Sequence, residues 1–329
     1  MAGFLKNKIF VLGLVTLLCV SCKQSHPPNS SKPLDQMTVA ELKTVADKGD
    51  PKAQFELGER FHLGRGVLQD SITAVDWWQK SAAQKYPPAE LSLGIAYGTG
   101  DGVPKSEQKG VELCQAAADS GWARAQENMG MLYFLGAGVQ KDYSRAFGWF
   151  KAAADQDWPP AQYHLAVCYR DGKGTLTNLP EAIIWFQRAA SNGLANSQAA
   201  LGHYYFDKGF AELGIPAQVK PDAPVTQEQL TNQNFVTGVE WYRKAANQGY
   251  SPGQFFLAFA YGDGAGVAKD PIECYKWFVL ASQGPHGEVW KLNTTNFTPE
   301  QLSAGKQRAE EFLKTNHVAP MFVHEIPGL

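Results

Sequence analysis

The stretch AQENMGMLYFLGAGVQKDYSRAFGWFKAAADQDW, residues 125–158, is the unit from which most of this chain of 329 residues is built. It begins with apolar and small residues at helical spacing, continues through two turn glycines, and ends in a second apolar segment with a Trp and a run of Ala. This order predicts two short helices joined by a glycine turn. Copies of the unit begin every 36 residues from Ala53 to Ser197, and a sixth begins at Gly253 after an insertion.

Equivalent positions in the copies carry the same kinds of residue. In the first predicted helix a leucine-like residue, a small residue and an aromatic ring stand at i, i+1 and i+4, as Leu57, Gly58 and Phe61 do in the first copy. These positions share one helical face. The second predicted helix carries a column of large apolar residues: Trp77, Leu113, Trp149, Trp185, Trp241 and Trp277. Burying one Trp removes about 150–250 Å² from water, more than a lone helical hairpin hides, so the copies are expected to stack into a solenoid.

The turns between the paired helices are equally regular. Two glycines follow the first helix in every copy except the fifth, and they supply the left-handed backbone that ends a helix. Before the second helix stand Asp or Asn residues, which are expected to cap it: Asp70, Asp142, Asn178 and Asp270.

These columns resemble the Sel-one-like repeat (SLR) family, relatives of the tetratricopeptide repeat. The matching pattern is A-Q-x-x-L-G-x-x-Y-x-x-G-x-G-V followed by A-x-x-W-F-x-x-A-A, and it recurs through residues 53–284. The resemblance implies an all-α solenoid of about six helix-turn-helix repeats that forms a right-handed superhelix. Residues 37–52 are expected to form an N-terminal capping helix, and residues 285–329 a C-terminal capping helix and tail.

The fifth copy departs from the pattern. It loses its second turn glycine and gains an insertion of about residues 210–235, which is rich in Pro, Gln and Asn. This composition predicts an extended loop, followed by a longer second helix from about Thr226. Two interpretations stay open at this point, a tolerated surface decoration and a contact for a specific partner.

The N-terminal segment predicts export and lipidation. Residues 1–21 combine early lysines, a short apolar run and a small final residue, which is typical of a secretory signal peptide. The string Cys19-Val20-Ser21-Cys22 resembles a bacterial lipobox, which implies a lipid on Cys22 and a tether over residues 22–36. By the same resemblance, Lys23 favours anchoring in the bacterial outer membrane, with the repeat domain in the periplasm or exposed at the surface. The alternative is an ordinary signal peptide that happens to end near a cysteine.

The sequence offers no catalytic, metal or cofactor constellation. The histidines form no ligand pair at i, i+4, and Ser303–Lys306 matches a penicillin-binding pattern without its partner motifs. Cys114, Cys168 and Cys274 occupy apolar or small columns, which predicts buried thiols, although one disulfide stays open. The formal net charge of −2 gives no basic footprint for nucleic acid. The chain is therefore expected not to be an enzyme; the alternative is an envelope enzyme acting on β-lactam or peptidoglycan fragments.

What remains is recognition of a protein or peptide partner. On each first helix a second stripe stands beside the packing face, and by resemblance to tetratricopeptide stacks it lines the concave groove. From the third copy onward this stripe is rich in aromatic residues with one arginine, the types that anchor protein interfaces. The alternative is that many of these rings pack between repeats. The predicted partner-binding anchors are Phe134, Tyr163, Arg170, His203, Phe206, Phe255 and Phe259.

Overall fold

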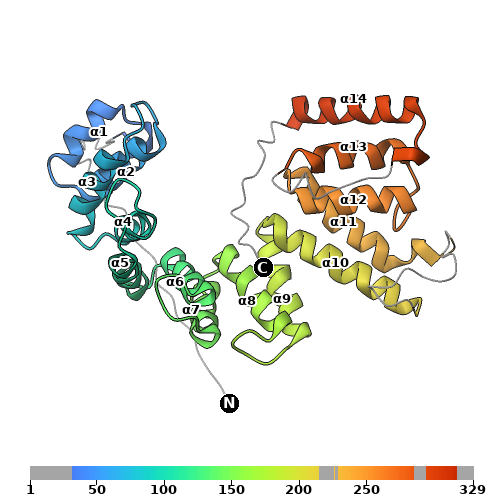
Figure 1. Ribbon diagram of the computed structural model, residues 1–329, viewed down its shortest axis with the longest axis horizontal. Helices are drawn as coiled ribbons and strands as arrows, with labels where there is room; N and C mark the ends of the chain where they lie inside the picture. The colour runs from blue at the N-terminus through green and yellow to red at the C-terminus, as the bar shows by residue number, and fades with distance from the viewer. Residues whose placement is uncertain (1–31, 215–225, 227–228, 285–293, 317–329) are drawn as a thin grey trace, which may run out of the picture.

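The protein is a curved stack of paired α-helices, seen in a computed structural model that describes residues 32–214, 226, 229–284 and 294–316. The described residues form fourteen α-helices and three short 3-10 turns, with no strand among them. The predicted signal peptide and Cys22 lie outside the described residues. In Figure 1 the N-terminal helices stand on one side, the C-terminal helices stand on the other, and the middle repeats connect them.

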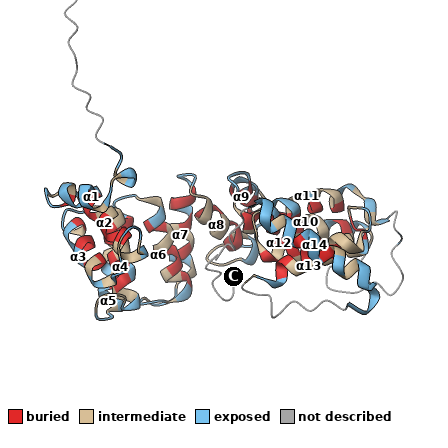
Figure 2. Ribbon diagram, turned by 90° about the horizontal axis from the view of Figure 1, so that it is seen from above, coloured by how far each residue is buried: buried red, intermediate tan, exposed pale blue. Residues whose placement is uncertain are grey.

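Each repeat contributes two antiparallel helices. The first helices of the six repeats are α2 (Pro51–Leu63), α4 (Pro87–Thr99), α6 (Ala123–Leu135), α8 (Pro159–Asp171), α10 (Ala195–Glu212) and α12 (Ser251–Asp263). The second helices are α3 (Ser71–Ala82), α5 (Glu107–Asp119), α7 (Tyr143–Ala154), α9 (Leu179–Ser191), α11 (Gln233–Asn247) and α13 (Pro271–Ser282). Consecutive helices pack against one another all along the chain, which is the arrangement of a solenoid. Figure 2 shows that buried residues lie on the helix faces that meet inside the stack.

The small column of the first helix lets a ring of the second helix pack directly on its backbone. A Cβ added at Gly58 would lie 2.5 Å from Trp78, and one at Gly130 would lie 2.5 Å from Phe150. Since real Cβ atoms do not approach rings that closely, glycine at these positions sets the distance between the two helices of a repeat.

The predicted helix ends are confirmed. The carboxylate of Asp70 accepts hydrogen bonds from the backbone N–H groups of Ile72 and Thr73 at 3.0 and 3.1 Å, and Asp142 and Asp270 cap their helices in the same way. The amide oxygen of Asn178 accepts a single hydrogen bond, from the backbone N–H of Glu181. The first helices of five repeats end at a glycine with left-handed φ: Gly64, Gly100, Gly136, Gly172 and Gly264.

Helices α1 (Val39–Ala46) and α14 (Pro299–Asn316) cover the two ends of the stack. The buried guanidinium of Arg60 binds the segment that precedes α1. It donates to the carbonyl oxygen of Met37 at 2.6 Å and to that of Leu34 at 2.9 Å. At the other end Trp277 of α13 packs edge-on against Phe312 of α14, with ring centroids 5.1 Å apart. None of the described helices has the length and apolar character needed to cross a membrane.

The fifth repeat differs from its expected form. Most of the extra helical length belongs to the first helix, because α10 has 18 residues and runs to Glu212. The second helix is longer too, with 15 residues, but α11 begins only at Gln233 after a 3-10 turn and not near Thr226. The cause is local. Both turn-glycine positions, and not the second alone as expected, carry other residues here, Lys208 and Phe210, so no glycine ends the helix at this point. Residues 215–225 and 227–228 of the insertion lie outside the described part.

Candidate functional site

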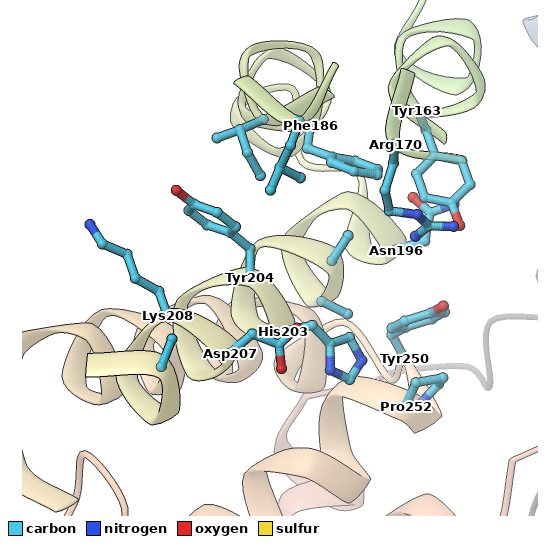
Figure 3. A pocket seen from close by; sticks show the side chains of 15 residues that line it. Tyr163, Arg170, Phe186, Asn196, His203, Tyr204, Asp207, Lys208, Tyr250 and Pro252 are labelled. Carbon is cyan, nitrogen blue, oxygen red and sulfur yellow. The ribbon is translucent and has the colours of Figure 1, made fainter. Parts of the chain in front are cut away.

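A pocket of about 820 Å³ lies at the fifth repeat. Its walls come from α8, α9 and α10, and the beginning of α12 closes one end (Figure 3). This volume lies in the range of about 300–1,000 Å³ that is usual for ligand sites.

The first cause of the pocket is a small residue at a position where the other repeats carry larger side chains. Ala199 stands at the third position of the repeat unit and lines the pocket. The other copies carry larger side chains there: Phe55, Leu91, Glu127, Tyr163 and Phe255. In the fifth repeat no large side chain fills the pocket at this column, and Ala199 itself is only 3% exposed beside Ala195, Ala245 and Tyr250.

The second cause is the missing turn of the fifth repeat. In repeat four the turn glycine Gly174 lies against the backbone carbonyl of Tyr143, where any Cβ would collide with it. The position on α9 that corresponds to Tyr143 is Leu179, and α10 continues as a helix in place of the turn that would cover it. Leu179 is consequently 46% exposed, and with Ile183 and the ring of Phe186 it forms the apolar wall of the pocket.

Charged side chains stand at the rim. Arg170, near the end of α8, donates from Nε and Nη2 to the Asp171 carboxylate at 2.6 and 3.1 Å, and this pairing lowers the pKa of Asp171. Its Nη1 makes no hydrogen bond within the described part of the chain. On α10, Asp207 and Lys208 also line the pocket, and burial raises the pKa of Asp207.

His203 is a neutral polar group in the floor of the pocket. Its Nδ1 lies 3.0 Å from the hydroxyl of Tyr242, and its ring packs edge-on against Phe256 with centroids 4.1 Å apart. Burial, with a smaller contribution from the positive charge of Arg170, lowers the pKa of His203 to about 4. The imidazole is therefore uncharged at neutral pH and offers hydrogen bonding without a charge.

The seven predicted anchors separate into three groups. Tyr163, Arg170 and His203 all line the pocket, so the structure brings these three together. Phe134 is only 4% exposed and packs against the rings of Tyr143 and Phe150.

Phe206 is half-buried against Phe235 and Tyr242. The rings of Phe206 and Phe134 therefore pack between helices and do not line an exposed groove. Phe255 and Phe259 contact each other on α12, with centroids 4.7 Å apart, and do not line the pocket.

Several lining residues escaped the sequence-based prediction. Leu179 and Ile183 belong to a second helix, and the predicted groove considered first helices only. Asp207 stands at the last helical position of the other copies, as Leu63 and Asp171 do, and so lies outside the predicted stripe. The signal that could have revealed them was the coincidence of Ala199 with a missing turn glycine in one copy.

The thiols and the acidic groups offer no second site. Cys114, Cys168 and Cys274 are buried and unpaired, as expected of small apolar residues, and burial raises the pKa of Cys114 and of Cys168 to about 12. In the described ranges, no three His, Cys, Asp or Glu side chains gather in a way that could hold a metal ion.

Comparisons with known proteins identify the repeat. The family model of the Sel1 repeat matches residues 51–86, 87–122, 123–158, 159–194, 228–250 and 251–286. A protective antigen of uropathogenic Escherichia coli strains with an SLR fold is similar in structure, with a TM-score of 0.62 and 29% identity over 84% of this chain. This chain spans only 56% of that antigen.

A Sel1 repeat protein from Oxalobacter formigenes gives a TM-score of 0.60 at 24% identity, with 83% of this chain and 68% of that one covered. The comparison with curated proteins gives no match. Six family matches cover more than half of the chain. Five of them coincide with helix pairs of the stack, and the match at 228–250 covers α11 without α10. The chain therefore belongs to the Sel1 repeat family.

Proposed function

We propose that this chain is a lipid-anchored envelope scaffold that binds a protein or peptide partner at the pocket of its fifth repeat. Sel1 repeats generally mediate protein–protein interactions. The observation that carries the proposal is that Tyr163, Arg170 and His203 together line a pocket of about 820 Å³ at the repeat whose turn is missing. Repeated residues build the stack, so a singular feature is where specificity is expected.

The partner site is tested by site-specific photocrosslinking in cells. A photoreactive amino acid in place of Tyr204, which lines the pocket, is expected to yield a discrete adduct. The same amino acid at Ser144, an exposed position on α7, is the matched control. Equal adducts at both positions, or none at Tyr204, would refute the assignment of the partner site. Turnover of nitrocefin or of muropeptides by the purified protein would contradict a pure scaffold.

The anchor is supported by the lipobox-like string that ends in Cys22. Several acyl chains would hold the stack at a membrane, since each buried CH₂ contributes about 0.8 kcal/mol. Palmitate labelling is expected in the native chain and absent after Cys22→Ala, and globomycin is expected to block processing. Labelling that persists in Cys22→Ala would exclude this anchor.

A further inference from the structure

We propose that the pocket of the fifth repeat selects an acidic peptide segment, with a large apolar side chain inserted against α9 and a neighbouring carboxylate held by Arg170. This inference rests on the proposed function, because it names the chemistry of the partner at the same site. It does not depend on the membrane anchor.

The apolar part of the pocket fits one large side chain. Leu179, Ile183 and Phe186 form its wall on α9, while Ala199 and Ala200 form a shallow floor on α10. Leu179 is 46% exposed, whereas the turn of the following repeat lies against the corresponding residues Tyr143 and Phe235, which are half-buried and buried. Covering this surface with an aromatic or large aliphatic side chain removes apolar area from water, at roughly 25 cal/mol per Å².

The charges of the rim favour an acidic ligand. The charged groups that line the pocket are Arg170, Lys208 and Asp207, which leaves one net positive charge. Asp171, which pairs with Arg170, lies 3.6 Å from Lys173, so the salt-bridge cluster behind the rim adds no net negative charge.

The geometry of Arg170 makes it the carboxylate-binding group. Asp171 occupies Nε and Nη2 and fixes the plane of the guanidinium. Nη1 remains available to a ligand, and a charge-assisted hydrogen bond from a guanidinium to a carboxylate is among the strongest polar contacts. Because Asp171 has already ordered the side chain, binding a ligand there costs less conformational entropy.

The cations Arg170 and Lys208 disfavour a basic ligand. Asp207 is the one acidic side chain that lines the pocket, and Lys208 is its direct neighbour on α10. His203 contributes no charge at neutral pH, because burial keeps its pKa at about 4. A segment rich in Lys or Arg would meet the cations Arg170 and Lys208 with only Asp207 to compensate.

The experiment measures fluorescence anisotropy with three short synthetic peptides of equal length and the full chain in detergent. The first peptide carries Trp-Leu flanked by Asp and Glu, the second carries Trp-Leu flanked by Lys and Arg, and the third is acidic with Ser in place of Trp-Leu. We expect the first to bind best, with the other two weaker by about tenfold or more.

Two variants test the site itself. Ala199→Phe restores the kind of side chain that other repeats carry at this column, as Phe55 and Phe255 show, so the stack is expected to fold while the pocket is filled. It should abolish binding of the first peptide. Arg170→Gln should weaken binding by about tenfold, whereas Arg145→Gln, an exposed arginine of α7, should leave it unchanged. A thermal melt by circular dichroism verifies the fold, and Arg170→Gln decides alone if Ala199→Phe does not fold.

Preference for the basic peptide, or no binding of the acidic one, would overturn the inference. So would binding that neither variant alters. An adduct at Tyr204 in the cellular crosslinking without binding of the acidic peptide would mean that the site is correct and its proposed chemistry is wrong. Absence of the adduct would remove the proposed function itself.

Discussion

Glu90 is a buried acid at a position where five repeats have glutamine, and replacing it tests how the repeats are joined. In three other copies the side chain at this position donates from Nε2 to a carbonyl of the preceding repeat: Gln54 to Ala46 at 3.1 Å, Gln198 to Ala190 at 3.2 Å and Gln254 to Ala246 at 3.3 Å. The equivalent carbonyl for Glu90 is that of Ala82, eight residues earlier. An ionised carboxylate cannot donate to it and instead places negative charge beside an acceptor.

Glu90→Gln should therefore stabilise the protein at neutral pH. Glu90 is only 8% exposed, and burial raises its pKa above 4.5, while Lys85 acts in the opposite direction. The Ala82 carbonyl already accepts from the backbone N–H of Lys85 at 2.8 Å, so the gain is one additional hydrogen bond and the removal of a buried carboxylate. Together these are worth about 1–3 kcal/mol. For chains of about 150–250 residues, each kcal/mol raises Tm by roughly 2–4 °C.

The pH dependence gives the sharper test. Because the folded pKa of Glu90 is raised, its contribution to stability is fully present below the unfolded pKa and is lost as pH rises through the folded pKa. The advantage of Gln should thus be largest near pH 7 and disappear below about pH 4.5, where a protonated Glu90 can donate as Gln does. The assay is urea unfolding of both variants across this range. The reverse change Gln254→Glu, which removes the hydrogen bond to the Ala246 carbonyl, is the control and should destabilise at pH 7. Equal stability of Glu90→Gln and the native chain at pH 7, or a difference that does not shrink on acidification, would refute the reasoning.

Two further predictions concern packing and titration. Gly130→Ala should destabilise the stack by about 1–3 kcal/mol in urea unfolding, because its Cβ would lie 2.5 Å from Phe150. Gly148→Ala, with nothing within 4 Å of its Cβ, should stabilise by about 0.5–1 kcal/mol, and a similar loss in both variants would show that close approach is not the cause. The imidazole of His203 should stay neutral in NMR titrations until the pH falls towards 4, whereas protonation near pH 6.5 would contradict its burial. Since that pKa is lowered, the stability it contributes is present above about 6.5 and is lost as pH falls towards 4.

The repeated part of the fold was predictable because the same residue types recur at equivalent positions in several copies. A single glycine such as Gly130 is ambiguous, but glycine or alanine at the same position in all six copies points to a close approach of helices. The caps follow for the same reason, since Asp70 and Asp142 stand at equivalent places before an apolar run.

The pocket was only partly predictable because it arises from residues that are missing. Tyr163, Arg170 and His203 were found from their types, which are common in interfaces. The apolar wall on α9 was not found, because Leu179 is an ordinary residue at its column and becomes exposed only where α10 fails to end. Phe134 was misplaced because ring packing across a repeat depends on Tyr143 and Phe150, whose orientation no periodicity reveals.

The departure of the fifth repeat has its own stabilising contacts, which argues against simple loss of a turn. Phe206 and Phe210 on α10 pack against Phe235 of α11, with ring centroids 5.2 and 4.9 Å apart. Gly209 permits this contact, because a Cβ there would lie 2.9 Å from the Phe235 ring. The longer helix therefore packs against the following helix on one side while its other side leaves the α9 surface uncovered. A helix that is held in place by new aromatic packing can keep a pocket open at a fixed shape, as specific recognition requires.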